Sequence, residues 1–165
     1  MPSESSVPSG SSVPSRTATD ALRVLAARRE TLGCAESLTG GELAAALSGP
    51  AGASASFAGA VVAYATEVKR QLLGVTTEKV VSARCAAEMA HGLRSLLGVD
   101  WALATTGVAG PDRQEDQPVG TVYVGLSGPA GERTLRLALE GTRADIRAAA
   151  CAEAIALLRA ELGDG

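Results

Sequence analysis

Aromatic residues and histidine are scarce in this sequence. Its 165 residues include four aromatics, Phe57, Tyr64, Trp101 and Tyr123, and one histidine, His91. The core must therefore be built from alanine, valine and leucine, whose small side chains allow helices to pack closely on a sheet. A Ser-His-Asp triad needs a histidine beside its serine, and a zinc site with several imidazoles needs more than one. We therefore expect no metal site and no such triad, and we expect the histidine to face water.

Several other patterns are missing as well. No Walker A or GxGxxG loop follows an expected strand, no apolar run approaches the ~20 residues that span a membrane, and the start of the chain resembles no secretory signal. Cys34, Cys85 and Cys151 are an odd number at wide spacings, which predicts free, buried thiols and a reducing, cytoplasmic location. The net charge is −3 with acids and bases interspersed. We expect no cofactor, no nucleic-acid partner and no membrane surface.

Serine and proline dominate the first 16 residues, "MPSESSVPSGSSVPSR", which contain almost nothing that could be buried. This composition predicts a disordered tail over residues 1–16 and a single domain over residues 17–165.

Apolar periodicity and turn residues predict alternating helices and strands in the rest of the chain. We expect a helix capped by Thr19 or Asp20, one opened by a capping box of Thr39 and Glu42, and one capped by Thr66. The order predicts a three-layer α/β/α sandwich with a mixed, mostly parallel five-stranded sheet. The expected helices span residues 18–29, 39–47, 66–73, 80–98 and 141–162, and the expected strands 31–35, 57–64, 100–106, 119–127 and 132–139, the last two as a hairpin.

Lysine is rare too, because only Lys69 and Lys79 are lysines among the 15 basic Lys and Arg residues. An arginine keeps its proton in a protein, whereas a lysine in a dry pocket can be neutral and accept one. Lys69 falls in the first turn of an expected helix, where the helix dipole and burial would both lower its pKa. The ordinary alternative, a solvated lysine, is the more frequent outcome for either residue. The hydroxyl of Tyr64, five residues earlier, could relay a proton to the amine, although a tyrosine at a sheet rim explains this position equally well.

Ser37 lies in the strand-to-helix turn "ESLTGG". Its hydroxyl would be exposed there, and the free backbone N–H groups of Gly40 and Gly41 could stabilise an oxyanion. The arrangement is that of a nucleophile elbow without the GxSxG spacing. The alternative is that these residues only form a turn. Glu36 either positions a substrate group or is an exposed turn acid.

Two further segments could hold an anion. "TTGVAGPD" offers the hydroxyls and backbone N–H groups of Thr105, Thr106 and Gly107 for a phosphate, although a plain turn is the more common case. Arg143 and Arg147 stand four residues apart at the start of the last expected helix, so both could reach one phosphate. A solvated surface is the default interpretation of that pair.

Five ordered blocks resemble the CinA C-terminal domain family: "AESLTGG", "GAVVAYATEVKRQLLGV", "TTGVAGPD", "PVGTVYVGL" and "GTRADIR". The resemblance runs from about residue 18 to residue 162. It implies an anticodon-binding-domain-like sandwich and hydrolysis of the carboxamide of nicotinamide mononucleotide to nicotinate mononucleotide and ammonia. It also implies a serine-lysine dyad that works without metal or cofactor, and a homo-oligomer.

Carried onto this chain, the resemblance assigns catalysis to Ser37, Lys69 and Tyr64. The substrate-binding residues that follow from it and from the turn are Glu36, Thr39, Gly40, Gly41, Thr106, Gly107, Arg143 and Arg147. Two departures affect the rim of the expected pocket: the loop after Val75, "TTEKV", is shorter than in relatives, and "PDRQEDQ" replaces the usual "PDGG". A non-catalytic binding module in a competence- or damage-linked assembly, and a serine amidase or esterase acting on another small substrate, remain open as alternatives.

Overall fold

A computed structural model describes residues 13–163 of the chain. Its first helix, α1 (Val13–Arg28), begins five residues before the predicted start at residue 18, so its first turn lies in the stretch expected to be a tail. The predicted caps Thr19 and Asp20 are also wrong, since both lie within this helix. Pro14 is tolerated in a first helical turn because the N–H groups of that turn have no partner within the helix. The tail prediction for residues 1–12 lies outside the described residues.

Five strands form one mixed sheet in the order β2-β1-β3-β4-β5. β1 pairs in parallel with β2 and β3, whereas β4 pairs antiparallel with both β3 and β5. Four strands therefore run in one direction, and the predicted mixed, mostly parallel sheet and its hairpin are confirmed. The strands are β1 (Leu32–Glu36), β2 (Phe57–Val62), β3 (Trp101–Gly107), β4 (Thr121–Gly128) and β5 (Gly131–Ala138).

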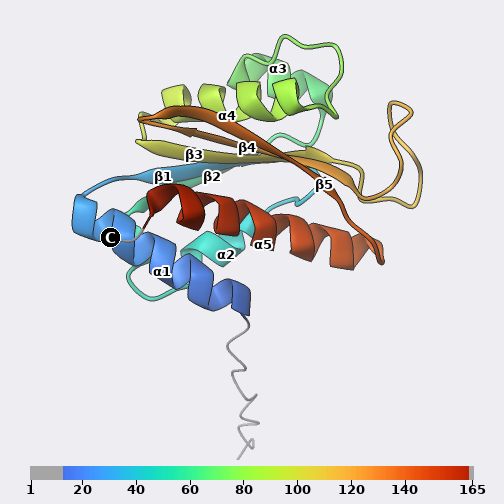
Figure 1. Ribbon diagram of the computed structural model, residues 1–165. Coiled ribbons are helices and arrows are strands. Elements are labelled where there is room, and N and C mark those ends of the chain that lie inside the picture. The colour runs from blue at the N-terminus through green and yellow to red at the C-terminus, as the bar shows by residue number, and fades with distance from the viewer. Residues whose placement is uncertain (1–12, 164–165) are drawn as a thin grey trace, which may run out of the picture.

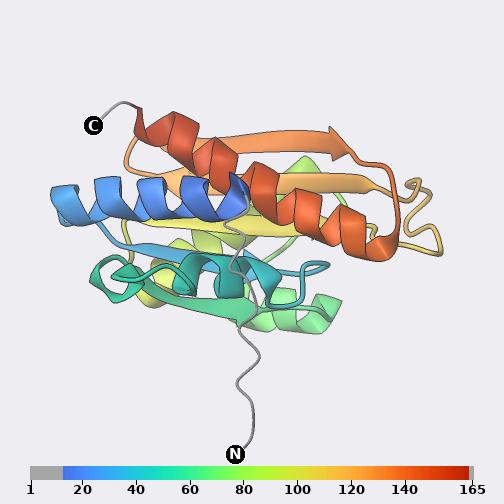
Figure 2. The ribbon, with the colours of Figure 1, turned by 90° about the horizontal axis from the view of Figure 1, so that it is seen from below.

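Helices cover both faces of this sheet (Figure 1). α3 and α4 lie on one face, while α1, α2 and α5 lie on the other, where α1 and α5 run side by side (Figure 2). The predicted three-layer α/β/α sandwich is therefore confirmed. The remaining elements are α2 (Glu42–Ser48), the short 3₁₀ helix η1 (Ala53–Ala55), α3 (Thr66–Leu73), α4 (Ala83–Leu97) and α5 (Arg143–Leu162).

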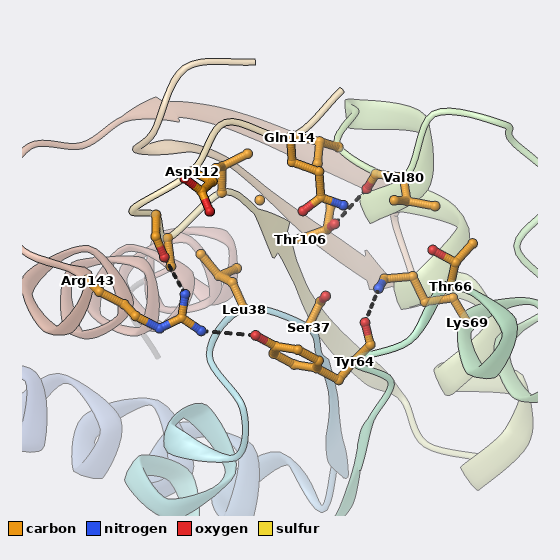
Figure 3. Close-up of a pocket in the computed structure, with 15 residues that line it drawn as sticks. Ser37, Leu38, Tyr64, Thr66, Lys69, Val80, Thr106, Asp112, Gln114 and Arg143 are labelled. Carbon is orange, nitrogen blue, oxygen red and sulfur yellow. Dashed lines mark hydrogen bonds between the residues drawn. The ribbon is translucent and has the colours of Figure 1, made fainter. Parts of the chain in front are cut away.

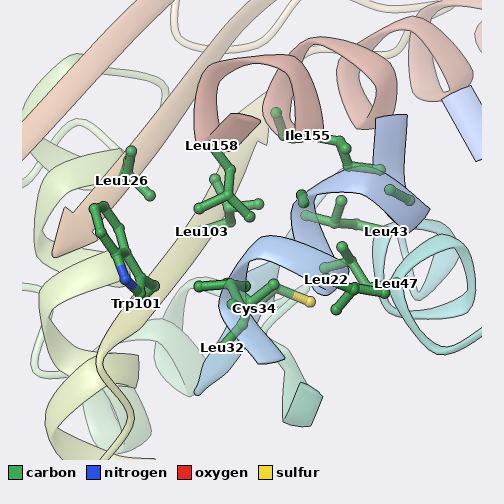
Figure 4. Packing of buried hydrophobic residues seen from close by; sticks show 14 of the residues in the cluster. Leu22, Leu32, Cys34, Leu43, Leu47, Trp101, Leu103, Leu126, Ile155 and Leu158 are labelled. Atoms are coloured by element: carbon green, nitrogen blue, oxygen red, sulfur yellow. The ribbon is translucent and has the colours of Figure 1, made fainter. Parts of the chain in front are cut away.

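Small and branched aliphatic side chains fill the core on both faces, as the scarcity of aromatics predicts. The larger cluster packs α1, α2 and α5 onto the sheet around residues such as Leu22, Leu103 and Ile155 (Figure 4). The second packs α3 and α4 onto the opposite face around Met89 and Leu93. Each layer buries an apolar face that would otherwise be exposed to water, which is the main stabilising term of such a sandwich.

The carboxyl ends of β1, β2 and β3 meet at one edge of the sheet because these three strands are parallel. Pairing extends just beyond β1 and β2, since Ser37 N–H donates to the Thr105 carbonyl at 3.0 Å and Ala63 N–H to the Glu36 carbonyl at 2.7 Å. Ligand sites of open α/β sheets lie at such an edge, outside the carboxyl ends of the strands. The turn after β1, the start of α3 and the loop after β3 all lie there.

Candidate active site

A cavity of about 240 Å³ lies at this edge of the sheet (Figure 3). It brings together six of the predicted site residues: Ser37, Tyr64, Lys69, Thr106, Gly107 and Arg143. Five others do not line it: Glu36, Thr39, Gly40, Gly41 and Arg147. The predicted constellation is therefore divided between groups that face the cavity and groups behind its wall.

Lys69 is buried in the wall of the cavity, with 2% of its surface exposed. Its Nζ donates a hydrogen bond to the main-chain carbonyl of Tyr64 at 3.1 Å. Burial lowers the pKa of the Lys69 ammonium, and the nearby Cys85 and Glu115 only partly oppose this effect. The solvated alternative is therefore wrong for Lys69, whereas it describes the exposed Lys79. Within the described residues, Lys69 Nζ makes no hydrogen bond to Ser37 Oγ.

Ser37 directly follows β1 and is 8% exposed. Its backbone is held by the hydrogen bond to the Thr105 carbonyl, and its side chain projects into the cavity between Leu38 and Lys69 (Figure 3). Ser37 is thus more buried than the exposed hydroxyl expected from the sequence, although it lines the cavity. Ser37, from the turn after β1, and the buried Lys69, from α3, thus line the same small cavity.

Tyr64 turns its ring toward the mouth of the cavity, where it is 60% exposed. Its hydroxyl accepts a hydrogen bond from the guanidinium of Arg143 at 2.9 Å. The expectation that this hydroxyl meets the Lys69 amine is wrong, because the group that faces Lys69 is the main-chain carbonyl of Tyr64. The side chain and the carbonyl of Tyr64 project in different directions from an extended backbone.

Glu36 is fully buried beneath the turn and caps α2. Its carboxylate accepts hydrogen bonds from the backbone N–H groups of Gly41 at 3.2 Å, Leu43 at 2.8 Å and Ala44 at 3.1 Å. The predicted substrate contact is therefore wrong, since both carboxylate oxygens satisfy the start of the helix.

The predicted capping box of Thr39 and Glu42 is also wrong. The N-cap of α2 is Gly41, which has a left-handed φ of 106° and no side-chain cap. The Thr39 hydroxyl instead shares a hydrogen bond of 2.8 Å with the Thr105 hydroxyl, which ties the turn to β3. A carboxylate from the preceding strand takes the place of the local cap that the sequence pattern indicates.

Gly40 and Gly41 do not form the oxyanion site expected from the sequence. The N–H of Gly40 donates to the Ser37 carbonyl at 3.1 Å, and that of Gly41 donates to Glu36. Both donors are already used, so the two glycines shape the turn rather than bind a reacting oxygen.

The two arginines of α5 face different neighbours. Arg143 lines the cavity and donates to the Gly110 carbonyl at 2.6 Å as well as to the Tyr64 hydroxyl. Arg147 lies behind the wall, where it pairs with Glu42 at 3.2 Å and donates to the Thr39 carbonyl at 3.2 Å. The prediction that both reach one anion is wrong, because Arg147 braces the Ser37 turn against α5.

The predicted caps of the neighbouring helices also differ from the structure. α5 opens with a capping box of Thr142 and Asp145, which the sequence reasoning missed. At α3 the N-cap is Ala65 without a side-chain hydrogen bond, so the predicted cap Thr66 is wrong; it is the first helical residue and lines the cavity.

Thr106 and Gly107 end β3 at the floor of the cavity. The Thr106 hydroxyl donates to the Val80 carbonyl at 2.6 Å, so it already has a protein acceptor. A Cβ at Gly107 would lie 2.6 Å from the carbonyl oxygen of Thr121, which means that glycine is needed for the close approach of β4.

Sequence reasoning missed part of the rim. Val80, Val81 and Gln114 line the cavity, and the carboxylate of Glu115 accepts hydrogen bonds from the N–H groups of Val80 and Val81. Val80 ends the loop after Val75, and Gln114 and Glu115 lie in "PDRQEDQ", the two segments where the sequence predicts an altered rim. No sequence pattern indicates that these two segments bind each other.

Cysteine and histidine take no part in this cavity. All three cysteines are free and buried, as predicted, and burial raises the pKa of Cys85 to about 11 and of Cys151 to about 12. His91 is exposed, as predicted, and lies 3.1 Å from Glu132.

Between residues 13 and 163 no group of three or more His, Cys, Asp or Glu side chains is arranged to hold a metal ion. No helix in that range is long and apolar enough to cross a membrane.

A profile of the CinA C-terminal domain family matches residues 15–162. A CinA-like protein from Frankia casuarinae is 52% identical over 143 residues, which cover 84% of this chain and 33% of that protein. A putative competence-damage inducible protein from Streptococcus gordonii is 41% identical, covering 86% of this chain and 35% of that protein. The chain thus spans about a third of the length of these curated relatives.

Solved structures of proteins from the same family have the same fold as this chain. A competence-damaged protein (CinA) superfamily protein from Klebsiella pneumoniae matches with a TM-score of 0.87 and 36% identity, covering 92% of this chain and 98% of that one. A competence/damage inducible protein from Agrobacterium tumefaciens matches with a TM-score of 0.87 and 30% identity, covering 98% of this chain and 100% of that one.

Proposed function

The chain belongs to the CinA C-terminal domain family, and from this premise we propose that it is an amidase that hydrolyses nicotinamide mononucleotide to nicotinate mononucleotide and ammonia. The observation that supports the proposal most is that Ser37 and the buried Lys69 line one cavity with Arg143 at its mouth. Such a cavity offers a nucleophile, a base and an anion-binding group in one place.

In the proposed reaction, Ser37 Oγ attacks the carboxamide carbon while neutral Lys69 accepts the hydroxyl proton. Lys69 then passes this proton to the departing amide nitrogen, which leaves as ammonia, and water hydrolyses the acyl-enzyme ester to release nicotinate mononucleotide and restore the Ser37 hydroxyl. A base must be neutral to accept a proton, so the lowering of the Lys69 pKa by burial supports this role.

The rest of the cavity fits the other parts of the nucleotide. Arg143 can bind the phosphate in a forked geometry if it releases Tyr64 and Gly110. The carboxylate of Asp112 also lines the cavity and favours a positively charged pyridinium ring. Binding energy from these groups is gained away from the reacting bond and helps to orient the carboxamide.

One observation favours a second candidate, a binding module without catalysis. Lys69 Nζ is bound to the Tyr64 carbonyl, and the proposed reaction requires it to turn toward Ser37 Oγ when substrate enters. Catalytic hydrogen bonds often form only in the substrate complex, which is why we prefer the amidase. The third alternative, a serine amidase acting on another small molecule, is tested by the same assay with other amides.

The deciding experiment compares wild type, Ser37→Ala and Lys69→Ala for ammonia release and for binding of nicotinamide mononucleotide by calorimetry. Turnover by wild type alone, with binding retained in the Ser37 variant, supports the amidase. Binding without turnover in all three proteins supports the binding module. Equal turnover in all three would exclude the dyad.

A further inference from the structure

Two segments far apart in the sequence are joined at the rim of the cavity by one side chain. Glu115 accepts a hydrogen bond from the N–H of Val80 at 2.9 Å through Oε1 and from the N–H of Val81 at 2.8 Å through Oε2. Hydrogen bonds of this kind, from neutral donors to a carboxylate, are stronger than those between neutral groups. Glu115 itself is half-buried and does not line the cavity.

The segment that Glu115 holds is fixed from its other side as well. The Val80 carbonyl accepts the hydroxyl hydrogen of Thr106, at the end of β3, at 2.6 Å. Val80 and Val81 are 4% and 3% exposed, and both line the cavity. The short loop therefore carries an apolar part of the cavity wall, and its backbone is bound to β3 on one side and to Glu115 on the other.

The backbone at Glu115 adopts a conformation that needs support. Glu115 and Asp116 have φ values of 51° and 61°, the left-handed region that is unfavourable for residues with a side chain. Arg113 supports the turn by donating to the Asp116 carbonyl at 2.7 Å, and Gln114 pairs with Gln117 through a β-bridge. A strained backbone conformation is kept where the surrounding contacts hold it in place, and such residues often lie at functional sites.

We propose that Glu115 is a positioning residue of this cavity, which fixes the wall of Val80 and Val81 against which the ring of the substrate lies. The inference rests on the proposed function for the identity of the substrate. Without the Glu115 carboxylate, the two N–H groups lose their acceptors, and the wall keeps the hydrogen bond from Thr106 and the packing of Val80 in the core. The wall then moves more freely, and substrate binding must include the cost of ordering it.

The test compares Glu115→Gln with Asp116→Asn, which removes the same charge from the neighbouring position. In Gln one of the two carboxylate oxygens becomes an NH₂ group, which cannot accept a hydrogen bond, so the N–H that faced this oxygen loses its acceptor while the size and shape of the side chain are kept. Three quantities are measured for each protein: the hydrogen-exchange rates of the Val80 and Val81 amides by NMR, the KM and kcat of ammonia release, and the Kd of nicotinamide mononucleotide by calorimetry.

We expect Glu115→Gln to speed exchange of at least one of the two amides by about tenfold or more. KM and Kd should rise by about three- to tenfold, a larger change than that in kcat. Asp116→Asn should change each quantity by less than about twofold. An unchanged exchange rate in Glu115→Gln, or faster exchange with unchanged KM and Kd, would overturn the inference.

The two proposals fail in different ways. If wild type binds the mononucleotide without turnover, the amidase is excluded, while exchange and Kd still decide the role of Glu115. If wild type neither binds nor hydrolyses the mononucleotide, both proposals are overturned.

Discussion

The buried side-chain amine of Lys69 donates a hydrogen bond of 3.1 Å to the main-chain carbonyl of Tyr64, five residues earlier in the chain. One neutral acceptor does not replace the water that an ammonium loses on burial, so the charged form is disfavoured and the pKa is lowered. The other lysine, Lys79, is exposed. The chain therefore contains an internal control for the effect of burying a lysine.

Replacing Lys69 by methionine should stabilise the protein. Burial disfavours the charged form of Lys69, and Met fills a similar space with no charge to desolvate. We expect Lys69→Met to raise the free energy of unfolding by about 1 kcal/mol and Tm by about 2 to 4 °C, at the expense of activity. Lys79→Met should change stability by less than about 0.5 kcal/mol. Thermal melts at pH 7 check this, and a lower Tm in Lys69→Met would contradict it.

The same pair of variants tests the pH dependence of stability. The Lys69 pKa is lower in the folded state than its ordinary value of 10.5. Between those two values the unfolded chain binds more protons, so this lysine makes the free energy of unfolding rise with pH. The difference in unfolding free energy between Lys69→Met and wild type, measured by urea titration at several pH values, should therefore shrink as the pH approaches 10.5. A difference that does not depend on pH would contradict the lowered pKa.

Glu36 should matter for stability through the cap of α2. Gln in its place keeps the shape but presents an NH₂ group to backbone N–H donors and removes the charge at the helix start. We expect Glu36→Gln to lower the free energy of unfolding by about 2 to 4 kcal/mol, measured by urea denaturation. The control is Glu42→Gln, which breaks the partly exposed pair with Arg147 and should lower it by at most about 1 kcal/mol. Equal effects of the two changes would contradict the capping role.

Arg143 and Arg147 offer a matched pair for the phosphate. They lie on the same helix, but only Arg143 lines the cavity. We expect Arg143→Gln to raise KM for nicotinamide mononucleotide by about tenfold or more, and to change KM for nicotinamide riboside, which has no phosphate, by less than about twofold. Arg147→Gln should leave the ratio of the two KM values unchanged. If both variants change that ratio equally, Arg143 is not the phosphate-binding residue.

The fold followed from local pattern and from the order of elements. Alternation of helices and strands predicted the layers and the mixed sheet, and Gly98 was correctly placed at the end of α4, where it has a left-handed φ of 63°. The start of α1 was missed because a serine- and proline-rich stretch has the composition of a tail. Composition does not show that its last residues continue a helix that packs on the domain.

The candidate site was predicted less completely, and the errors have two causes. Lys69 was singled out because lysine is rare in this chain, whereas Ser37 and Arg143 were assigned roles mainly through the family resemblance. Local caps were misassigned or missed because several polar residues near each helix start could serve, as with Glu36 in place of Thr39 at α2 and with Thr142 at α5. The contact of Glu115 with Val80 and Val81 joins distant segments, and no local pattern records how such loops meet at the end of the sheet.

Ammonia release from nicotinamide mononucleotide, compared between wild type and Ser37→Ala, tests the central claim most directly. Ser37 is the proposed nucleophile, and Ala in its place removes the hydroxyl that attacks the carboxamide. We expect steady release by wild type and a loss of about a thousandfold or more in kcat for Ser37→Ala, with binding of the mononucleotide retained. Equal release by the two proteins, or no release by a wild type that binds the mononucleotide, would contradict the account.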